Sequence, residues 1–203
     1  AWESDPWGRH FLGTPPQGRA DYAFFQHILR SMDPKTGRCA ILFPHGVLFR
    51  KDEAELRRKL VETDMVECVL GLGPSLFYNS PMEACVVICR STKPKRTKGK
   101  TLFIDAVHEI GRENSQSFLR AEHKKRILSA YQAFENQSDF SHVATTDEIL
   151  AQKGDLTVHH YVTRKPMVSN NFDNETLAEA WERFDTEGRE FWTSMDALVE
   201  AFD

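Results

Sequence analysis

The amino-acid sequence predicts an α/β fold, in which helices cover a sheet of buried strands. Short apolar runs alternate with amphipathic helical segments between residues 21 and 106, an order typical of strands joined by helices. The runs are apolar on both faces of the strand, which favours a parallel-type sheet covered on both sides. The 203 residues are 40% hydrophobic and 28% charged, which indicates one folded domain with an appendage.

The first helix is predicted at Asp21–Met32, where apolar side chains recur with helical spacing. The run 38–43 is predicted to be the first strand, and Pro44 ends it because proline cannot donate to a sheet ladder. Asp52 and Glu55 have the spacing of a capping box, which predicts the start of the next helix. The predicted buried stripe of the first helix comprises Phe24, Phe25, Ile28, Leu29 and Met32.

Three further strands are predicted at the apolar runs 65–73, 83–90 and 101–106, and a helix at residues 123–134. No pair of cysteines has the two-residue spacing that zinc sites favour. We therefore expect no metal site and interpret the cysteines as reduced core residues. They are Cys39, Cys68, Cys85 and Cys89.

A second capping box is formed by Thr145 and Glu148. It predicts a short helix that stops at Gly154. The run 156–162 then alternates in polarity and is predicted to be a short edge strand. On such a strand the adjacent His159 and His160 would face opposite sides, which is unlike a metal site or a catalytic triad.

The charge of the chain divides it into two parts. Residues 1–162 hold 22 Lys and Arg against 20 Asp and Glu, whereas residues 163–203 hold 4 against 10. We predict a polar linker at residues 163–172 and an acidic helical tail at residues 173–203. The tail carries a heptad-like apolar seam that predicts docking to another helix. The seam comprises Leu177, Trp181, Phe184, Phe191, Met195, Leu198 and Phe202; packing of this seam on the first part is the alternative.

Two loops should meet at the carboxyl ends of the predicted strands, where open α/β sheets bind ligands. The first is the turn Pro44, His45 and Gly46, and the second is the segment 73–81, which contains Phe77, Tyr78 and Asn79. Two adjacent aromatic rings and a carboxamide on a rigid loop suit the stacking of a planar ligand. The alternative is that Phe77 only pins its loop to the core.

A basic run follows the strand predicted at 83–90. Its cations are candidates for contact with DNA phosphates, although a solvated loop has the same composition. They are Lys93, Lys95, Arg96 and Lys98.

Six ordered blocks resemble the modification (methyltransferase) subunit of type I restriction-modification systems, from about Trp2 to Val162. The blocks read ADYAFFQHIL, ILFPHGVLFR, EAELRRKL, SLFYNSPMEACVVICR, KGKTLFIDAV and LTVHHYV. The resemblance implies the C-terminal portion of a class I, Rossmann-like methyltransferase domain over residues 1–162. It implies transfer of a methyl group from S-adenosylmethionine to the N6 amine of a flipped adenine in DNA.

The resemblance also implies which groups act. The cofactor loop and the Asn-Pro-Pro-Phe motif of the family lie upstream of its block that is similar to Ala1-Trp2, so we expect no catalytic residue in this chain and no activity from it alone. Phe77, Tyr78 and Asn79 fall where related enzymes contact the base, and Pro44, His45 and Gly46 would line the cleft. Asn79, Ser80 and Pro81 depart from the commoner glycine-rich pattern of the family.

The family's partners are DNA, a specificity subunit, a restriction subunit and a second methyltransferase subunit. The sequence shows no signal peptide or membrane span, which favours the cytoplasm. The competing interpretation is a non-enzymatic module that docks a partner through its acidic C-terminal helix.

Overall fold

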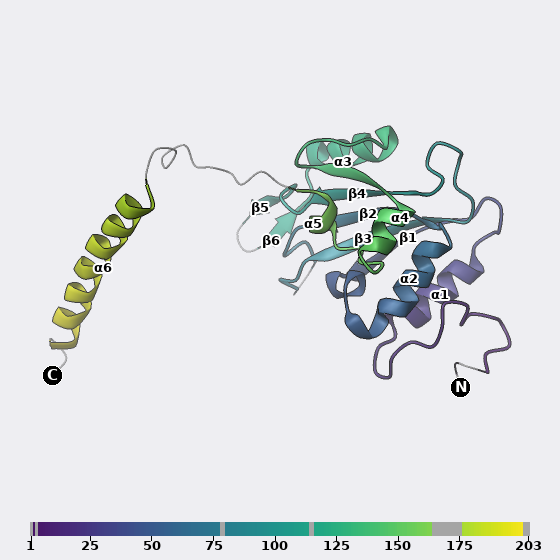
Figure 1. Ribbon diagram of the computed structural model, residues 1–203, viewed down its shortest axis with the longest axis horizontal. Coiled ribbons are helices and arrows are strands. Elements are labelled where there is room, and N and C mark those ends of the chain that lie inside the picture. Colours follow the sequence, from purple (N-terminus) through teal and green to yellow (C-terminus); the bar gives the residue numbers. More distant parts are fainter. Residues whose placement is uncertain (1, 3, 78–79, 114–115, 164–175, 201–203) are drawn as a thin grey trace. The chain divides into compact units, whose positions relative to one another are not determined.

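The computed structural model describes residues 2, 4–77, 80–113, 116–163 and 176–200 (Figure 1). The chain divides into two compact units, Ala1–Arg164 and Lys165–Asp203. The first unit holds the sheet, and the second holds the single described helix α6 (Leu177–Glu200). The predicted linker lies almost entirely outside the described residues. Within the described ranges, no helix is long and apolar enough to cross a bilayer.

A five-stranded mixed sheet forms the centre of the first unit, in the order β1-β3-β2-β4-β7. Strands β2 and β4 pair in parallel, and the other three neighbouring pairs are antiparallel. Because β1 and β2 both run antiparallel to β3, strands β1, β2 and β4 point the same way and end at one edge. The strands are β1 (Arg38–Pro44), β2 (Val66–Leu72), β3 (Ala84–Arg90), β4 (Lys100–Ala106) and β7 (Ser141–Thr145).

The predicted α/β sheet is confirmed, and its first four strands lie within one or two residues of the predicted runs. The expectation of a parallel-type sheet is correct only for the direction of β1, β2 and β4. Strand β3 enters between β1 and β2 in the opposite direction, and its apolar run gave no sign of that direction.

The strand predicted at residues 156–162 is wrong, because this segment forms the short helix α5 (Val158–Tyr161). Val158 and Val162 are both buried and four residues apart, and the Val162 N–H donates to the Val158 carbonyl at 2.9 Å. That spacing satisfies a helix as well as a strand. The fifth strand is β7, which the sequence did not predict. A small hairpin of β5 (Gly111–Glu113) and β6 (Gln116–Phe118) was also missed.

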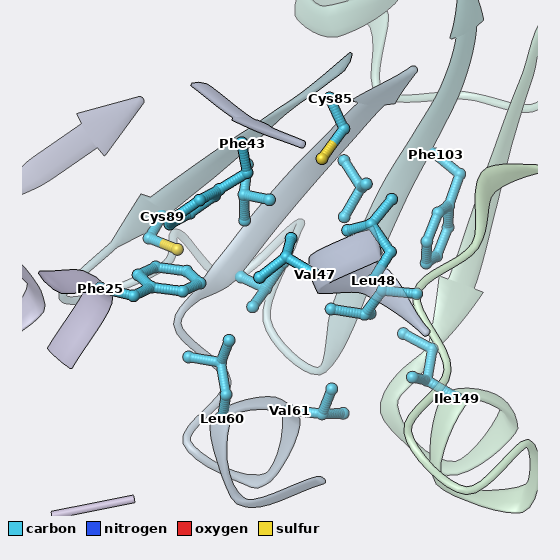
Figure 2. Packing of buried hydrophobic residues seen from close by; sticks show 14 of the residues in the cluster. Phe25, Phe43, Val47, Leu48, Leu60, Val61, Cys85, Cys89, Phe103 and Ile149 are labelled. Atoms are coloured by element: carbon cyan, nitrogen blue, oxygen red, sulfur yellow. The ribbon is translucent and has the colours of Figure 1, made fainter. Parts of the chain in front are cut away.

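Helices cover the two faces of the sheet unequally (Figure 1). One face packs against α1 (Asp21–Ser31), α2 (Ala54–Glu62), α4 (Thr146–Ala151) and α5, through the cluster shown in Figure 2. In that cluster Phe25 of α1, Leu60 of α2 and Ile149 of α4 are buried together. Among the described helices of the first unit, α3 (Ala121–Ala133) is the one that packs against the other face.

Of the two capping boxes that the sequence predicts, one is confirmed and one is wrong. Thr145 and Glu148 form the predicted capping box at α4, with the Glu148 N–H donating to Thr145 Oγ1 at 3.2 Å. The capping box predicted at Asp52 is wrong, because α2 begins at Ala54 and the Asp52 carboxylate pairs with Arg19 at 2.8 Å.

The buried face of α1 differs from the predicted stripe. Phe25 and Leu29 are buried as expected, but Phe24 is 64% exposed and Tyr22 and Gln26 are buried in its place. All four cysteines are free thiols, as expected, and only Cys39 is partly exposed.

Candidate functional site

The carboxyl ends of β1, β2 and β4 bring distant parts of the sequence to one edge of the sheet. The turn at Pro44 leaves β1, and the loop that begins at Gly73 leaves β2. A side chain at Gly73 would place its Cβ 2.3 Å from the carbonyl oxygen of Val107, just beyond β4. Only glycine lets the loop run this close to the end of β4, so Gly73 fixes the direction in which the loop departs.

A shallow hollow of about 230 Å³ opens at this edge. Pro44 from the first predicted loop and Phe77 from the second both line it, so the structure brings together the two loops that the sequence singled out. Phe77 is half-buried, and its carbonyl accepts a hydrogen bond from the Ser80 N–H at 3.1 Å. The remaining lining residues are Leu42, Phe43, Ser80, Met82, Glu83 and Ala84.

The hollow is mostly apolar and open. Leu42 and Met82 expose 48% and 62% of their surface, although both are large hydrophobic residues that folding normally covers. Ser80 and Glu83 are the polar residues of the lining. An open apolar surface with an aromatic ring at its margin suits a flat, uncharged ring system better than a phosphate or a sugar.

The turn that follows β1 is held rigidly from several sides. His45 begins a 3-10 turn, His45–Leu48, whose Val47 and Leu48 side chains are buried in the core (Figure 2). The Tyr22 hydroxyl donates to the Val47 carbonyl at 3.3 Å, and the Leu156 N–H donates to the Leu48 carbonyl at 3.0 Å. These contacts fix Pro44 and His45 at the sheet edge without any help from a ligand.

A cluster of polar side chains, His45, His159 and Asp105, lies beside this turn. The sequence did not predict that these three residues come together. The His45 ring lies 6.3 Å from the ring of His159, and His159 Nδ1 lies 3.5 Å from Oδ2 of the buried Asp105. Burial lowers the pKa of His45 and outweighs the opposing effect of the Glu83 carboxylate, and the neighbouring His159 lowers it further, which favours a neutral imidazole. His159 lies on α5, which is a helix rather than the predicted strand.

The predicted base contacts Tyr78 and Asn79 lie outside the described residues. Of that predicted set, Phe77 is therefore the residue that the structure places. Pro44 lines the hollow, whereas His45 and Gly46 lie in the adjoining turn.

The basic run lies at the opposite edge of the sheet. It connects the end of β3 to the start of β4, so a seven-residue strand separates it from the hollow, a span of roughly 20 Å. Lys95 and Lys98 are exposed, while the Arg96 guanidinium donates to the Gln132 carbonyl at 3.0 Å. Arg96 therefore helps to terminate α3, where a cation is favourable.

The prediction that Lys93 contacts DNA phosphates is wrong. Its side chain is 1% exposed, and its Nζ lies 2.7 Å from Asp64 Oδ1 and 2.6 Å from the Lys100 carbonyl oxygen. A buried ammonium with these partners is a structural group that DNA cannot reach.

We expect Lys93→Met to lower the free energy of unfolding by about 2 kcal/mol, because it leaves the Asp64 carboxylate and the Lys100 carbonyl without their cation. Urea denaturation measures the change. Lys95→Met, at an exposed position in the same loop, is the matched control and should change stability by less than about 0.5 kcal/mol. Equal stability of the two variants would contradict the role assigned to Lys93.

The second unit is a long helix with exposed apolar side chains. Leu177, Trp181 and Phe184 are 88%, 69% and 68% exposed, and the Trp181 and Phe184 rings lie 5.9 Å apart. Met195 is 42% exposed. The side chains of Phe191 and Leu198, and residue Phe202, lie outside the described part of the chain.

A metal ion or S-adenosylmethionine would need particular groups among the described residues. No three His, Cys, Asp or Glu side chains in the described ranges are grouped so as to hold a metal ion. The hollow is smaller than the roughly 300 Å³ or more that a cofactor-sized ligand requires. Its lining offers few polar groups to bind an amino acid or a ribose. The residues that line the hollow therefore do not fit a complete S-adenosylmethionine.

A model of the N-6 DNA methylase family matches residues 2–169. The type I restriction enzyme MjaIX methylase subunit of Methanocaldococcus jannaschii is 32% identical over 76% of this chain and 29% of its own length. The HindI methylase subunit of Haemophilus influenzae is 33% identical over 76% of this chain and 36% of its own length. The chain spans about a third of the length of these curated relatives.

A solved structure shows the same fold. The type I restriction-modification system methyltransferase subunit from Streptococcus thermophilus superposes with a TM-score of 0.73 and 31% identity. The superposition covers 79% of this chain and 34% of that chain. The family match, over residues 2–169, includes nearly all of the first unit.

Proposed function

The chain belongs to the N-6 DNA methylase family, and from this premise we propose that it is the C-terminal part of an adenine-N6 DNA methyltransferase. The complete protein would be the modification subunit of a type I restriction-modification system. It would transfer a methyl group from S-adenosylmethionine to an adenine flipped out of DNA. A non-enzymatic docking module is the less favoured alternative, because the family match covers the sheet as well as the hollow at its edge.

The hollow at the carboxyl edge is the observation that supports this proposal best. An enzyme that modifies a base must take it out of the stack and hold it by stacking against aromatic or apolar side chains. Phe77 offers a ring at the margin of an apolar hollow, and Pro44 supplies a rigid wall. We propose that these two residues hold the extruded adenine, and that Tyr78 and Asn79 complete its contacts.

The methyl donor is proposed to bind mostly to a part of the subunit outside this chain. The hollow is too small and too apolar for the whole cofactor, as described above. S-adenosylmethionine, when bound, would supply the methyl group. This chain would supply the apolar surface that holds the base.

The test is to compare this chain with the complete subunit. We expect residues 1–203 alone to show no calorimetric binding of S-adenosylmethionine and no methylation. The complete subunit, assembled with its specificity subunit, should convert adenine in duplex DNA to N6-methyladenine, detected by mass spectrometry of digested nucleosides. Micromolar cofactor binding to the chain alone would overturn the placement of the cofactor site. Absence of N6-methyladenine from the complete enzyme's product would overturn the activity.

We also propose that α6 docks the chain to a helical region of the specificity subunit, so that two methyltransferase subunits and a restriction subunit assemble around DNA. The exposed Trp181 and Phe184 favour this proposal, since aromatic side chains of this kind are typical anchors of interfaces. The acidic residues of the tail would favour a basic partner helix. The cytoplasm is the compartment that fits this role.

A further inference from the structure

We infer that cations of the β5–β6 hairpin and of the first turn and a half of α3 bind DNA phosphates beside the hollow, in place of the basic loop between β3 and β4. The inference rests on the proposed function and names the surface through which that site would hold its substrate. The cationic surface comprises Arg112, Arg120, Lys124 and Lys125, all of which are exposed.

The position of this surface is the first argument. The Ser117 N–H of β6 donates to the carbonyl of Ser75 at 3.0 Å, so the hairpin is attached to the loop that carries Phe77. The α3 helix starts directly after this hairpin, at the same edge of the sheet as the hollow (Figure 1). Phosphates that flank a base held at Phe77 would therefore lie near this surface.

An apolar groove lies beside α3, and its sheet residues neighbour those of the hollow. A groove of about 400 Å³ runs between α3 and the sheet, with Lys124 and Val86 in its lining. Val86 of β3 is directly opposite Leu42 of β1, and Leu42 lines the hollow. Lys124 thus lines a groove whose Val86 is the cross-strand neighbour of Leu42 in the hollow.

The folded structure does not account for these cations. A helix N-terminus carries a partial positive charge, so Arg120, at the N-cap of α3, is placed where a cation weakens the helix. Within the described residues, the side chains of Arg112, Lys124 and Lys125 have no ion-pair or hydrogen-bond partner. The exposed Glu113 and Glu122 lie on the same surface and reduce its charge only in part.

Other cations nearby differ from these, because their side chains have structural partners. Arg126 pairs with Glu109 and lies 4.0 Å over the Phe140 ring, so its place in α3 has a structural reason. Arg120 lies 5.5 Å over the Phe118 ring of β6, which positions its guanidinium beside the hairpin but leaves its charge unpaired. In the loop between β3 and β4, Lys93 and Arg96 are occupied by structural contacts.

The experiment compares two triple substitutions in the complete enzyme as purified. One variant is Arg120→Gln, Lys124→Gln and Lys125→Gln; the matched control is Lys95→Gln, Lys98→Gln and Lys100→Gln at the opposite edge. Binding to a fluorescent duplex that contains the recognition sequence is followed by anisotropy across a range of salt concentrations. Thermal unfolding and cofactor binding verify that both variants are folded.

We expect the first variant to bind the duplex about 10-fold or more weakly at physiological salt. The slope of log K against log salt should fall by roughly 1 to 3, since each lost phosphate contact contributes about 0.9. The control should lose less than about 3-fold. An unchanged slope in the first variant, or an equal loss in the control, would overturn the inference.

A methylation assay of the wild-type enzyme distinguishes a failure of this inference from a failure of the proposed function. If the wild-type enzyme methylates DNA and the first variant binds normally, the inference alone fails. If the wild-type enzyme binds DNA through this surface but never methylates adenine, the proposed activity fails and the surface stands. An enzyme that binds no DNA overturns both.

Discussion

Phe77→Ala in the complete methyltransferase should lower the turnover of DNA methylation by about 10- to 100-fold. Base-on-aromatic stacking contributes about 1 to 3 kcal/mol per base, and each 1.4 kcal/mol corresponds to a factor of about ten in rate. Phe77 is half-buried at the margin of the hollow, and its backbone is fixed by the hydrogen bond to Ser80. Loss of the ring should leave the loop in place and remove the wall against which the base rests.

Single-turnover methylation of a short duplex measures this effect, and urea denaturation measures stability in parallel. Phe24→Ala is the matched control, because Phe24 is an exposed phenylalanine on α1, outside the hollow, and its removal should leave the rate unchanged. A folded Phe77→Ala variant with the full rate would show that the ring does not hold the base. A large loss of stability would instead identify Phe77 as a core residue that pins its loop.

The double substitution Trp181→Ala and Phe184→Ala should weaken assembly with the specificity subunit by about 100-fold or more. Aromatic anchors at the centre of an interface each contribute about 2 kcal/mol or more, and these two rings are adjacent and largely exposed. Removal of residues 170–203 should abolish assembly. Both variants should retain cofactor binding, because the affected residues lie in the second unit.

Co-purification and analytical ultracentrifugation with the specificity subunit measure the loss. The matched control is Asp185→Ala with Arg189→Ala, which removes an exposed ion pair on the same helix; it should change affinity by less than about 5-fold. Assembly at undiminished affinity after removal of the tail would contradict the docking role. A fall in the stability of the first unit would indicate that the tail packs there.

Much of the fold was predictable because continuous apolar runs have few alternatives. The run that forms β1 ends at a proline, and the runs that form β2 and β3 are mostly apolar on successive residues, which is typical of short buried strands. The Thr145–Glu148 capping box was likewise readable, since its two hydrogen bonds connect residues three positions apart. Such signals depend on neighbours in the sequence.

The segments that were predicted wrongly depend on distant partners. Residues 156–162 fit a strand and a helix equally well, and the position of Val158 against the sheet decided for α5. The Asp52 carboxylate was expected to cap a helix, but Arg19 lies near enough in the fold to pair with it. Lys93 had the composition of a phosphate contact until the fold buried it beside Asp64.

By itself, the sequence determined the α/β class, most strands and helices, the acidic tail and the two loops that meet at Pro44 and Phe77. The tertiary structure alone decided the antiparallel insertion of β3, the grouping of His45 with His159 and Asp105, and which cations remain exposed. The physical reason is the range of the interactions. Hydrophobic periodicity and caps act within a few residues, whereas strand direction, burial and ion pairing depend on segments far apart in the chain.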